Sequence, residues 1–156
     1  MRYIFIFSFL FVFSFGCKKA DNPTQPSTIV NTSTSVSSLK DGLLYTFTIP
    51  VNSFSIEDTL KGTFIILNQS SSSQVLVSGD SPIFQWSLKD SSGQSVMGMG
   101  PDHHLTYIDT LNPGASIAFT INNKFPNISG GFYSLDARLY SLNSIYPTLS
   151  LTIFLH

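Results

Sequence analysis

The sequence has little charge and almost no cysteine. Charged residues make up 11% of its 156 residues, and eight Lys and Arg against nine Asp and Glu give a formal net charge of −1. No basic run is present, which argues against nucleic acid as a partner, because neutralising phosphates requires clustered Lys and Arg. Cys17 has no second cysteine with which to form an internal disulfide.

The motifs of common catalytic and metal sites are absent as well. There is no His-x-x-x-His pair, no Gly-x-Ser-x-Gly elbow and no phosphate-binding loop. The densest group of candidate ligands is Asp102, His103 and His104, with Asp109 nearby in a predicted loop. Adjacent histidines in a strand point to opposite faces, so they do not chelate one ion. The sequence therefore predicts no enzyme activity, no metal and no cofactor.

The first seventeen residues have the pattern of an export signal. Arg2 supplies a positive charge, and the nearly apolar residues 3–15 follow. This run is shorter than the roughly 20 residues that span a membrane, but it suits a signal peptide. Residues 14–17, Ser-Phe-Gly-Cys, resemble a bacterial lipobox, although a bulky Phe before the glycine is unusual. We therefore expect residues 1–16 to be removed and Cys17 to carry a thioether-linked diacylglycerol, the alternative being that this cysteine leaves with the signal.

Residues 17–38 have the composition of a disordered tether. Two lysines follow the cysteine, and Pro23, Pro26 and many Ser, Thr and Asn residues leave few aliphatic side chains. Such a segment does not bury enough apolar surface to offset its chain entropy. Two or more acyl chains at Cys17 would give a stable anchor. We expect the protein on the bacterial cell envelope, tethered to the outer membrane or the cell surface.

The folded domain is expected over residues 39–156, which is enough chain for one hydrophobic core. Apolar and polar residues alternate with a period of two, which is typical of half-buried strands, and no segment has helical periodicity over three turns. Turn residues such as Asp90–Gly93 and Asn112–Gly114 separate the alternating segments. The fold predicted is an all-β, antiparallel β-sandwich. Its predicted strands are residues 43–49, 59–68, 84–89, 117–121, 133–140 and 149–155.

Two local patterns predict that the sandwich is immunoglobulin-like. Residues 131–137, Gly-Phe-Tyr-Ser-Leu-Asp-Ala, resemble the strand pattern G-x-Y-x-C-x-A, with Leu135 at the cysteine position. In such a strand the Tyr133 ring packs inside while its hydroxyl bonds to the backbone at a strand corner. Trp86, the only tryptophan, shares a face with apolar neighbours, which favours a place in the core over an exposed ligand-stacking position.

Scattered strand and turn positions carry a further resemblance. They are Asn68, Ser78, Gly79, Phe84, Trp86, Leu88, Asp90, Gly93, Val96, Leu111, Pro113, Gly114, Ser116, Gly131, Tyr133, Ala137 and Leu139. This set is similar to the BsuPI-type intracellular proteinase inhibitor domain, an immunoglobulin-like β-sandwich, over a little more than half of the folded domain. The chain departs from that family at Gln85, where an Asp is usual, at residues 97–99 and at the extra Ser81-Pro82. It is also predicted to be exported rather than intracellular.

The resemblance implies an exposed loop that enters a serine-protease cleft. Residues 96–105 are the best candidate for this partner-binding loop, which includes the two adjacent histidines. Met97 or Met99 would fill an apolar pocket, and Pro101 would stiffen the segment. The other interpretation is a flexible connection between strands whose Met side chains cover the end of the core. We favour the second, because glycines stand beside both Met residues.

Two hypotheses about function follow from these patterns. One is a membrane-anchored binding or structural module that holds a partner protein with an edge strand or a loop. The alternative is a proteinase inhibitor that protects envelope proteins from serine proteases. An inhibitor requires an ordered, protruding loop with an apolar residue at its tip, whereas a binding module presents a broad exposed patch or an open sheet edge.

Overall fold

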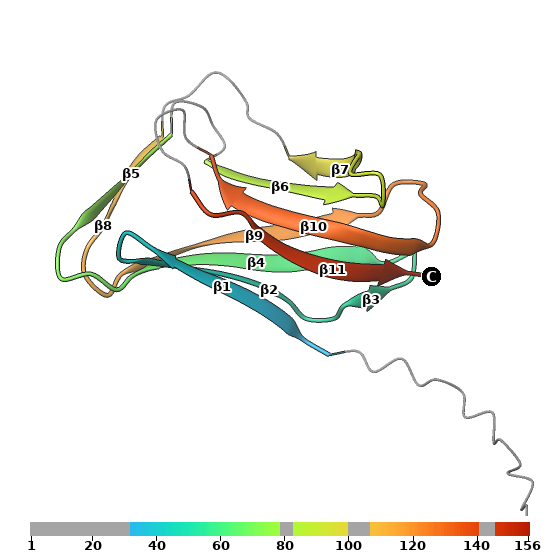
Figure 1. The fold of residues 1–156 in the computed structure, drawn as a ribbon, viewed down its shortest axis with the longest axis horizontal. Coiled ribbons are helices and arrows are strands. Elements are labelled where there is room, and N and C mark those ends of the chain that lie inside the picture. The colour runs from blue at the N-terminus through green and yellow to red at the C-terminus, as the bar shows by residue number, and fades with distance from the viewer. Residues whose placement is uncertain (1–31, 79–82, 100–106, 141–145) are drawn as a thin grey trace, which may run out of the picture.

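The computed structural model describes residues 32–78, 83–99, 107–140 and 146–156 (Figure 1). Every regular element in these ranges is a β-strand, and none of the described residues is helical. The all-β prediction is therefore confirmed. The predicted strands overlap six observed ones, because a largely alternating pattern of apolar and polar residues gives each of them one face to bury.

Two sheets pack face to face. The first has four strands in the order β1-β2-β4-β9, and the second has five in the order β3-β11-β10-β6-β7. A third sheet pairs β5 with β8 alone. All pairings between described strands are antiparallel except the short pairing of β3 with β11. The strands are β1 (Thr34–Lys40), β2 (Leu43–Ile49), β3 (Ser53–Phe54), β4 (Thr59–Asn68), β5 (Gln74–Ser78), β6 (Phe84–Lys89), β7 (Ser95–Met99), β8 (Tyr107–Leu111), β9 (Ser116–Lys124), β10 (Gly131–Leu139) and β11 (Leu149–Leu155).

The core lies between the inward faces of the two large sheets. Phe64 of β4 is fully buried, and its ring centroid lies 6.3 Å from those of Tyr45 and Phe47 on β2. The same ring lies 5.2 Å from Phe84 on β6, in the opposite sheet. Trp86 is also buried, as the sequence predicts. Aromatic contacts of this kind join the two sheets across the middle of the sandwich.

The sandwich begins earlier in the chain than the sequence predicts. Residues 34–38, assigned to the tether, form most of β1, which pairs with β2 along its whole length. Few apolar residues are available there, but the hydroxyls of Ser35 and Thr48 lie 2.9 Å apart across the pair, and a second Ser–Thr pair lies 3.0 Å apart. The turn between the strands is Asp41-Gly42, with φ values of 53° and 78°. Positive φ at both positions is what a two-residue hairpin turn requires.

The tyrosine corner predicted at the start of β10 is present. The Tyr133 hydroxyl donates a 2.7 Å hydrogen bond to the carbonyl oxygen of Ser129, and Leu135 is fully buried. Strand β10 lies between β11 and β6, as strand F lies between strands G and C in immunoglobulin domains. The fold is an immunoglobulin-like β-sandwich.

Replacing Tyr133 with Phe should lower the free energy of unfolding by about 1 kcal/mol, because it removes one hydrogen bond and leaves a carbonyl without its partner. Urea denaturation of the purified protein measures this change. Tyr140→Phe is the matched control, since the Tyr140 hydroxyl has no hydrogen-bond partner among the described residues. Equal stability of the two variants would contradict a stabilising corner.

Candidate protein-binding surface

Strands β5 and β8 form a two-stranded ribbon, here called the β5–β8 ribbon, at one end of the sandwich (Figure 1). Val77 lies opposite Ile108, and Val75 lies opposite Thr110. Because side chains alternate between the two faces of a strand, these residues share the outward face. Val75, Val77 and Ile108 are 57, 39 and 66% exposed there. The outward face of the ribbon is therefore apolar and accessible.

The inward face holds the ribbon against the protein, and no third strand of the described ranges pairs with it. Leu76 of β5 and Leu111 of β8 are buried in the hydrophobic core. Each strand of the ribbon has one neighbour, so the other edge of each carries backbone N–H and C=O groups with no described strand beside them. Open edges of this kind are templates for the addition of another strand.

The base of the ribbon is connected to the sandwich by Asn68, the last residue of β4. The residue is fully buried, and its Nδ2 donates 2.8 Å hydrogen bonds to the carbonyl oxygens of Ser72 and Leu111. Its Oδ1 accepts hydrogen bonds from the N–H and the hydroxyl of Ser70, at 2.9 and 2.7 Å. The amide therefore uses both donor hydrogens and both acceptor positions. These bonds fix the segment that leads into β5 and the end of β8.

The ribbon and the start of β1 lie at opposite ends of the sandwich. The Gln69 N–H donates a 2.8 Å hydrogen bond to the Gly42 carbonyl oxygen, which places the base of the ribbon at the turn between β1 and β2. Thr34, at the far end of β1, is opposite Ile49. In Figure 1 the ribbon is on the left, whereas β1 begins and the chain ends toward the right. Thr34, where β1 begins, is thus at the end of the sandwich away from the ribbon.

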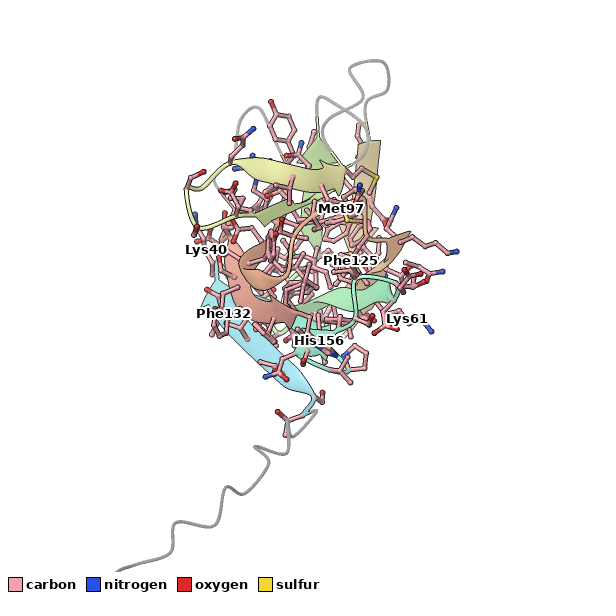
Figure 2. All side chains as sticks on the ribbon, turned by 90° about the vertical axis from the view of Figure 1, so that its right-hand side faces the viewer. Lys40, Lys61, Met97, Phe125, Phe132 and His156 are labelled. Atoms are coloured by element: carbon pink, nitrogen blue, oxygen red, sulfur yellow. The ribbon has the colours of Figure 1, made fainter. Side chains whose placement is uncertain are left out.

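Met97 and Met99 lie in strand β7, not in a loop over residues 96–105 as the sequence predicts. They pair with β6, and β7 forms an edge of the five-stranded sheet. Gly98 permits this pairing, since a Cβ there would lie 2.6 Å from the Trp86 carbonyl oxygen. The glycine that suggested a flexible loop instead allows two strands to approach closely. Met97, labelled in Figure 2, packs partly against the core, and Met99 is 39% exposed.

The other site residues predicted from the sequence, Cys17, Pro101, His103 and His104, lie outside the described residues. Asp109, predicted in a loop, lies in strand β8. Within the described ranges, no three His, Cys, Asp or Glu side chains gather to hold a metal ion. The same ranges contain no helix of the length and apolarity needed to cross a membrane.

Comparison with known proteins identifies no family for this chain. No protein-family model and no curated protein matches it. Among solved structures, it is similar to a β-glucosidase from Listeria innocua in complex with isofagomine (TM-score 0.44, 11% identity) and to one from Erythrobacter marinus (TM-score 0.43, 13% identity). These alignments cover 81 and 80% of this chain but only 16% of each glucosidase chain. Likeness this weak carries no argument about function.

The β5–β8 ribbon is not among the strands predicted from the sequence, although the sequence contains a weak signal for it. Val75-Leu76-Val77 is a short apolar run after a serine-rich turn, and Tyr107–Leu111 contains apolar residues without regular alternation. Runs this short are ambiguous by periodicity alone. The open face of the ribbon becomes visible only once the two segments are known to pair.

Proposed function

We propose that this protein is a bacterial envelope lipoprotein, anchored through Cys17, that binds a partner protein with the β5–β8 ribbon. The observation that carries the proposal is the exposed apolar face formed by Val75, Val77 and Ile108, on a ribbon whose outer edges pair with no other described strand. An extended partner segment would pair with one of these edges through backbone hydrogen bonds. Its apolar side chains at alternate positions would pack beside the exposed face.

The proposed anchor and the proposed binding surface are compatible in their positions. A flexible chain from Cys17 to Ser33 has an average end-to-end distance of about 20–25 Å. It would join the domain at the start of β1, and the ribbon lies at the other end. The ribbon would therefore be directed away from the membrane, where a partner has access to it.

The inhibitor alternative has less support from the geometry. Its two candidate pocket-filling residues, Met97 and Met99, belong to a paired strand rather than to a protruding loop. A titration of a subtilisin-type serine protease with the protein, following residual protease activity, separates the two functions. Unchanged activity favours the binding module, and a stoichiometric loss of activity favours the inhibitor.

Photo-crosslinking in cells tests the ribbon directly. A photoreactive residue placed at Ile108 should give a discrete adduct with a second protein, whereas the same residue at Ile65 should not. Ile65 is a suitable control because it is also an exposed Ile of a strand, 37% exposed, in the middle of the four-stranded sheet. Val77→Lys should reduce the adduct at position 108 at least about tenfold, because a charged side chain on a strand surface disfavours pairing. Equal adducts at both positions would contradict the proposal.

The anchor is tested separately in the same cells. Cys17→Ala should abolish labelling by fatty acid and release the protein from the membrane fraction, since no acyl chain then holds it. A variant that stays in the membrane fraction without label would contradict lipid anchoring. The crosslink at position 108 still reports on the ribbon in that case, so the two parts of the proposal fail independently.

A further inference from the structure

A small polar pocket lies on the outer face of the five-stranded sheet, where β6, β7 and β10 are neighbours. Its volume is about 200 Å³, and its lining includes Gln85 and Lys89 of β6 with Asp136 and Arg138 of β10. The register of the two strands sets Gln85 opposite Arg138. The pocket lies on a different sheet from the β5–β8 ribbon.

The charges of the pocket do not cancel. Lys89 Nζ lies 2.7 Å from Asp136 Oδ2 in an ion pair, and Ser134 Oγ donates a 2.9 Å hydrogen bond to the other carboxylate oxygen. Burial raises the pKa of Asp136, but the hydrogen bonds from Lys89, Ser150 and Ser134 outweigh it and hold that pKa below its ordinary value. Asp136 is thus ionised, and both of its carboxylate oxygens have hydrogen-bond partners. Arg138 has no ion pair within the described part of the chain, which leaves one net positive charge.

Gln85 adds a hydrogen-bond donor that has no acceptor. The residue is only 5% exposed, and its Oε1 accepts a long, 3.3 Å hydrogen bond from Arg138 Nη2. A guanidinium carries donors only, so the amide must present its oxygen to Arg138, and this fixes its orientation. The Nε2 group is then buried without a partner among the described residues. An unsatisfied buried donor is costly, and native structures contain few of them.

We propose that this pocket binds a small carboxylate ligand. A carboxylate matches the single net positive charge, and its two parallel oxygens fit the fork of the Arg138 guanidinium. The ligand would replace Gln85 Oε1 as the acceptor at Arg138. The Gln85 amide, released from Arg138, can then rotate about χ3, a torsion with little angular preference. Its Nε2–H group would donate a hydrogen bond to the ligand. A pocket of about 200 Å³ suits a small acid or the carboxyl end of a peptide.

NMR titration of the ¹⁵N-labelled full chain in detergent tests this proposal. Acetate should shift the Gln85 side-chain amide resonance saturably, and acetamide, which has the same shape without the charge, should not. A Gln85→Met variant assigns the resonance. Titrations with free dialanine and with its C-terminal amide then distinguish a peptide terminus from a free small acid as the source of the carboxylate. Tighter binding of dialanine than of acetate indicates a peptide terminus, and equal or weaker binding indicates a free small acid.

Matched variants decide whether Arg138 acts as inferred. Arg138→Met should weaken acetate binding by about tenfold or more, because a charge-assisted hydrogen bond is lost. Arg138→Lys keeps the charge but not the fork and should give an intermediate loss. Lys61→Met removes one exposed cation from the other sheet and should leave the affinity unchanged (Figure 2). No saturable shift with acetate, an equal shift with acetamide, or full binding by Arg138→Met would each overturn the proposal.

Discussion

Replacing Asn68 with Asp is expected to lower the free energy of unfolding by about 3 kcal/mol or more. The substitution preserves shape but removes the two Nδ2 donor hydrogens, so the buried carbonyl oxygen of Leu111 loses this hydrogen bond and the Ser72 carbonyl oxygen keeps only its bond from the Ser70 hydroxyl. Each unsatisfied buried group costs roughly 1–3 kcal/mol. The new carboxylate would also lie next to these carbonyls at a fully buried position, where a charge without a cation is strongly unfavourable.

Urea denaturation at two pH values measures this effect and identifies its cause. Burial should raise the pKa of the introduced carboxyl above its unfolded value of about 3.9. Below that unfolded-state pKa, the carboxyl is protonated in both the folded and the unfolded protein. As the pH rises above it, the unfolded protein ionises first, and the loss of folding stability grows. The stability difference from the natural protein should therefore be larger at pH 7 than at pH 4. A difference independent of pH would mean that lost donors, not charge, account for the effect.

Asn122→Asp is the matched control for this substitution. Asn122 is exposed on β9 and makes no side-chain hydrogen bond among the described residues, so the change should stay within about 0.5 kcal/mol. Hydrogen exchange adds a spatial test. Asn68→Asp should accelerate exchange in β5 and β8 more than in β10, because Asn68 holds the base of the ribbon. Uniform acceleration would contradict this local role.

Replacing Phe64 with Ala is expected to cost about 3–5 kcal/mol, the usual range for removing a large buried aromatic side chain. The Phe64 ring contacts aromatic rings in its own sheet and in the opposite one, so its loss leaves a cavity between the sheets. Small domains are stable by about 5–15 kcal/mol. The variant should therefore unfold at a clearly lower urea concentration with an unchanged denaturant slope.

Phe132→Ala is the control for Phe64→Ala. The Phe132 side chain is 70% exposed on the outer face of β10, and its ring contacts that of Phe154, with the ring centroids 5.0 Å apart (Figure 2). Its truncation should therefore cost only about 0.5–1.5 kcal/mol. Comparable losses in the two variants would mean that Phe64 is not at the centre of the packing between the sheets.

Together, these features explain how one small domain would present a binding surface. The aromatic core joins the two sheets, and Asn68 joins the sheets to the β5–β8 ribbon. Because the ribbon has only two strands, it depends on this connection and on its buried inward face for its order. We expect variants that loosen the base to weaken partner binding without altering the apolar outward face.

The strands that bury one face could be predicted from the amino-acid sequence. Apolar and polar residues alternate in β2, β4, β6, β9, β10 and β11, and the Tyr133 pattern indicated the corner confirmed at Ser129. The alternation is local information, because each side chain faces the core or the solvent according to its position in its own strand. Strand β1 was missed because its exposed face is rich in serine, although Asp41-Gly42 is a hairpin turn signal.

The β5–β8 ribbon and the polar pocket at Gln85 follow from the tertiary structure and could not be predicted from the sequence. Each depends on pairing between segments distant in the chain: Asn68 contacts Leu111 across 43 residues, and Gln85 contacts Arg138 across 53. A one-residue change of register would move every side chain of a strand to the other face, so composition does not reveal which polar groups meet. The order of residues in a strand determines which side chains share a face, and the packing of the sheets determines which of these side chains contact one another.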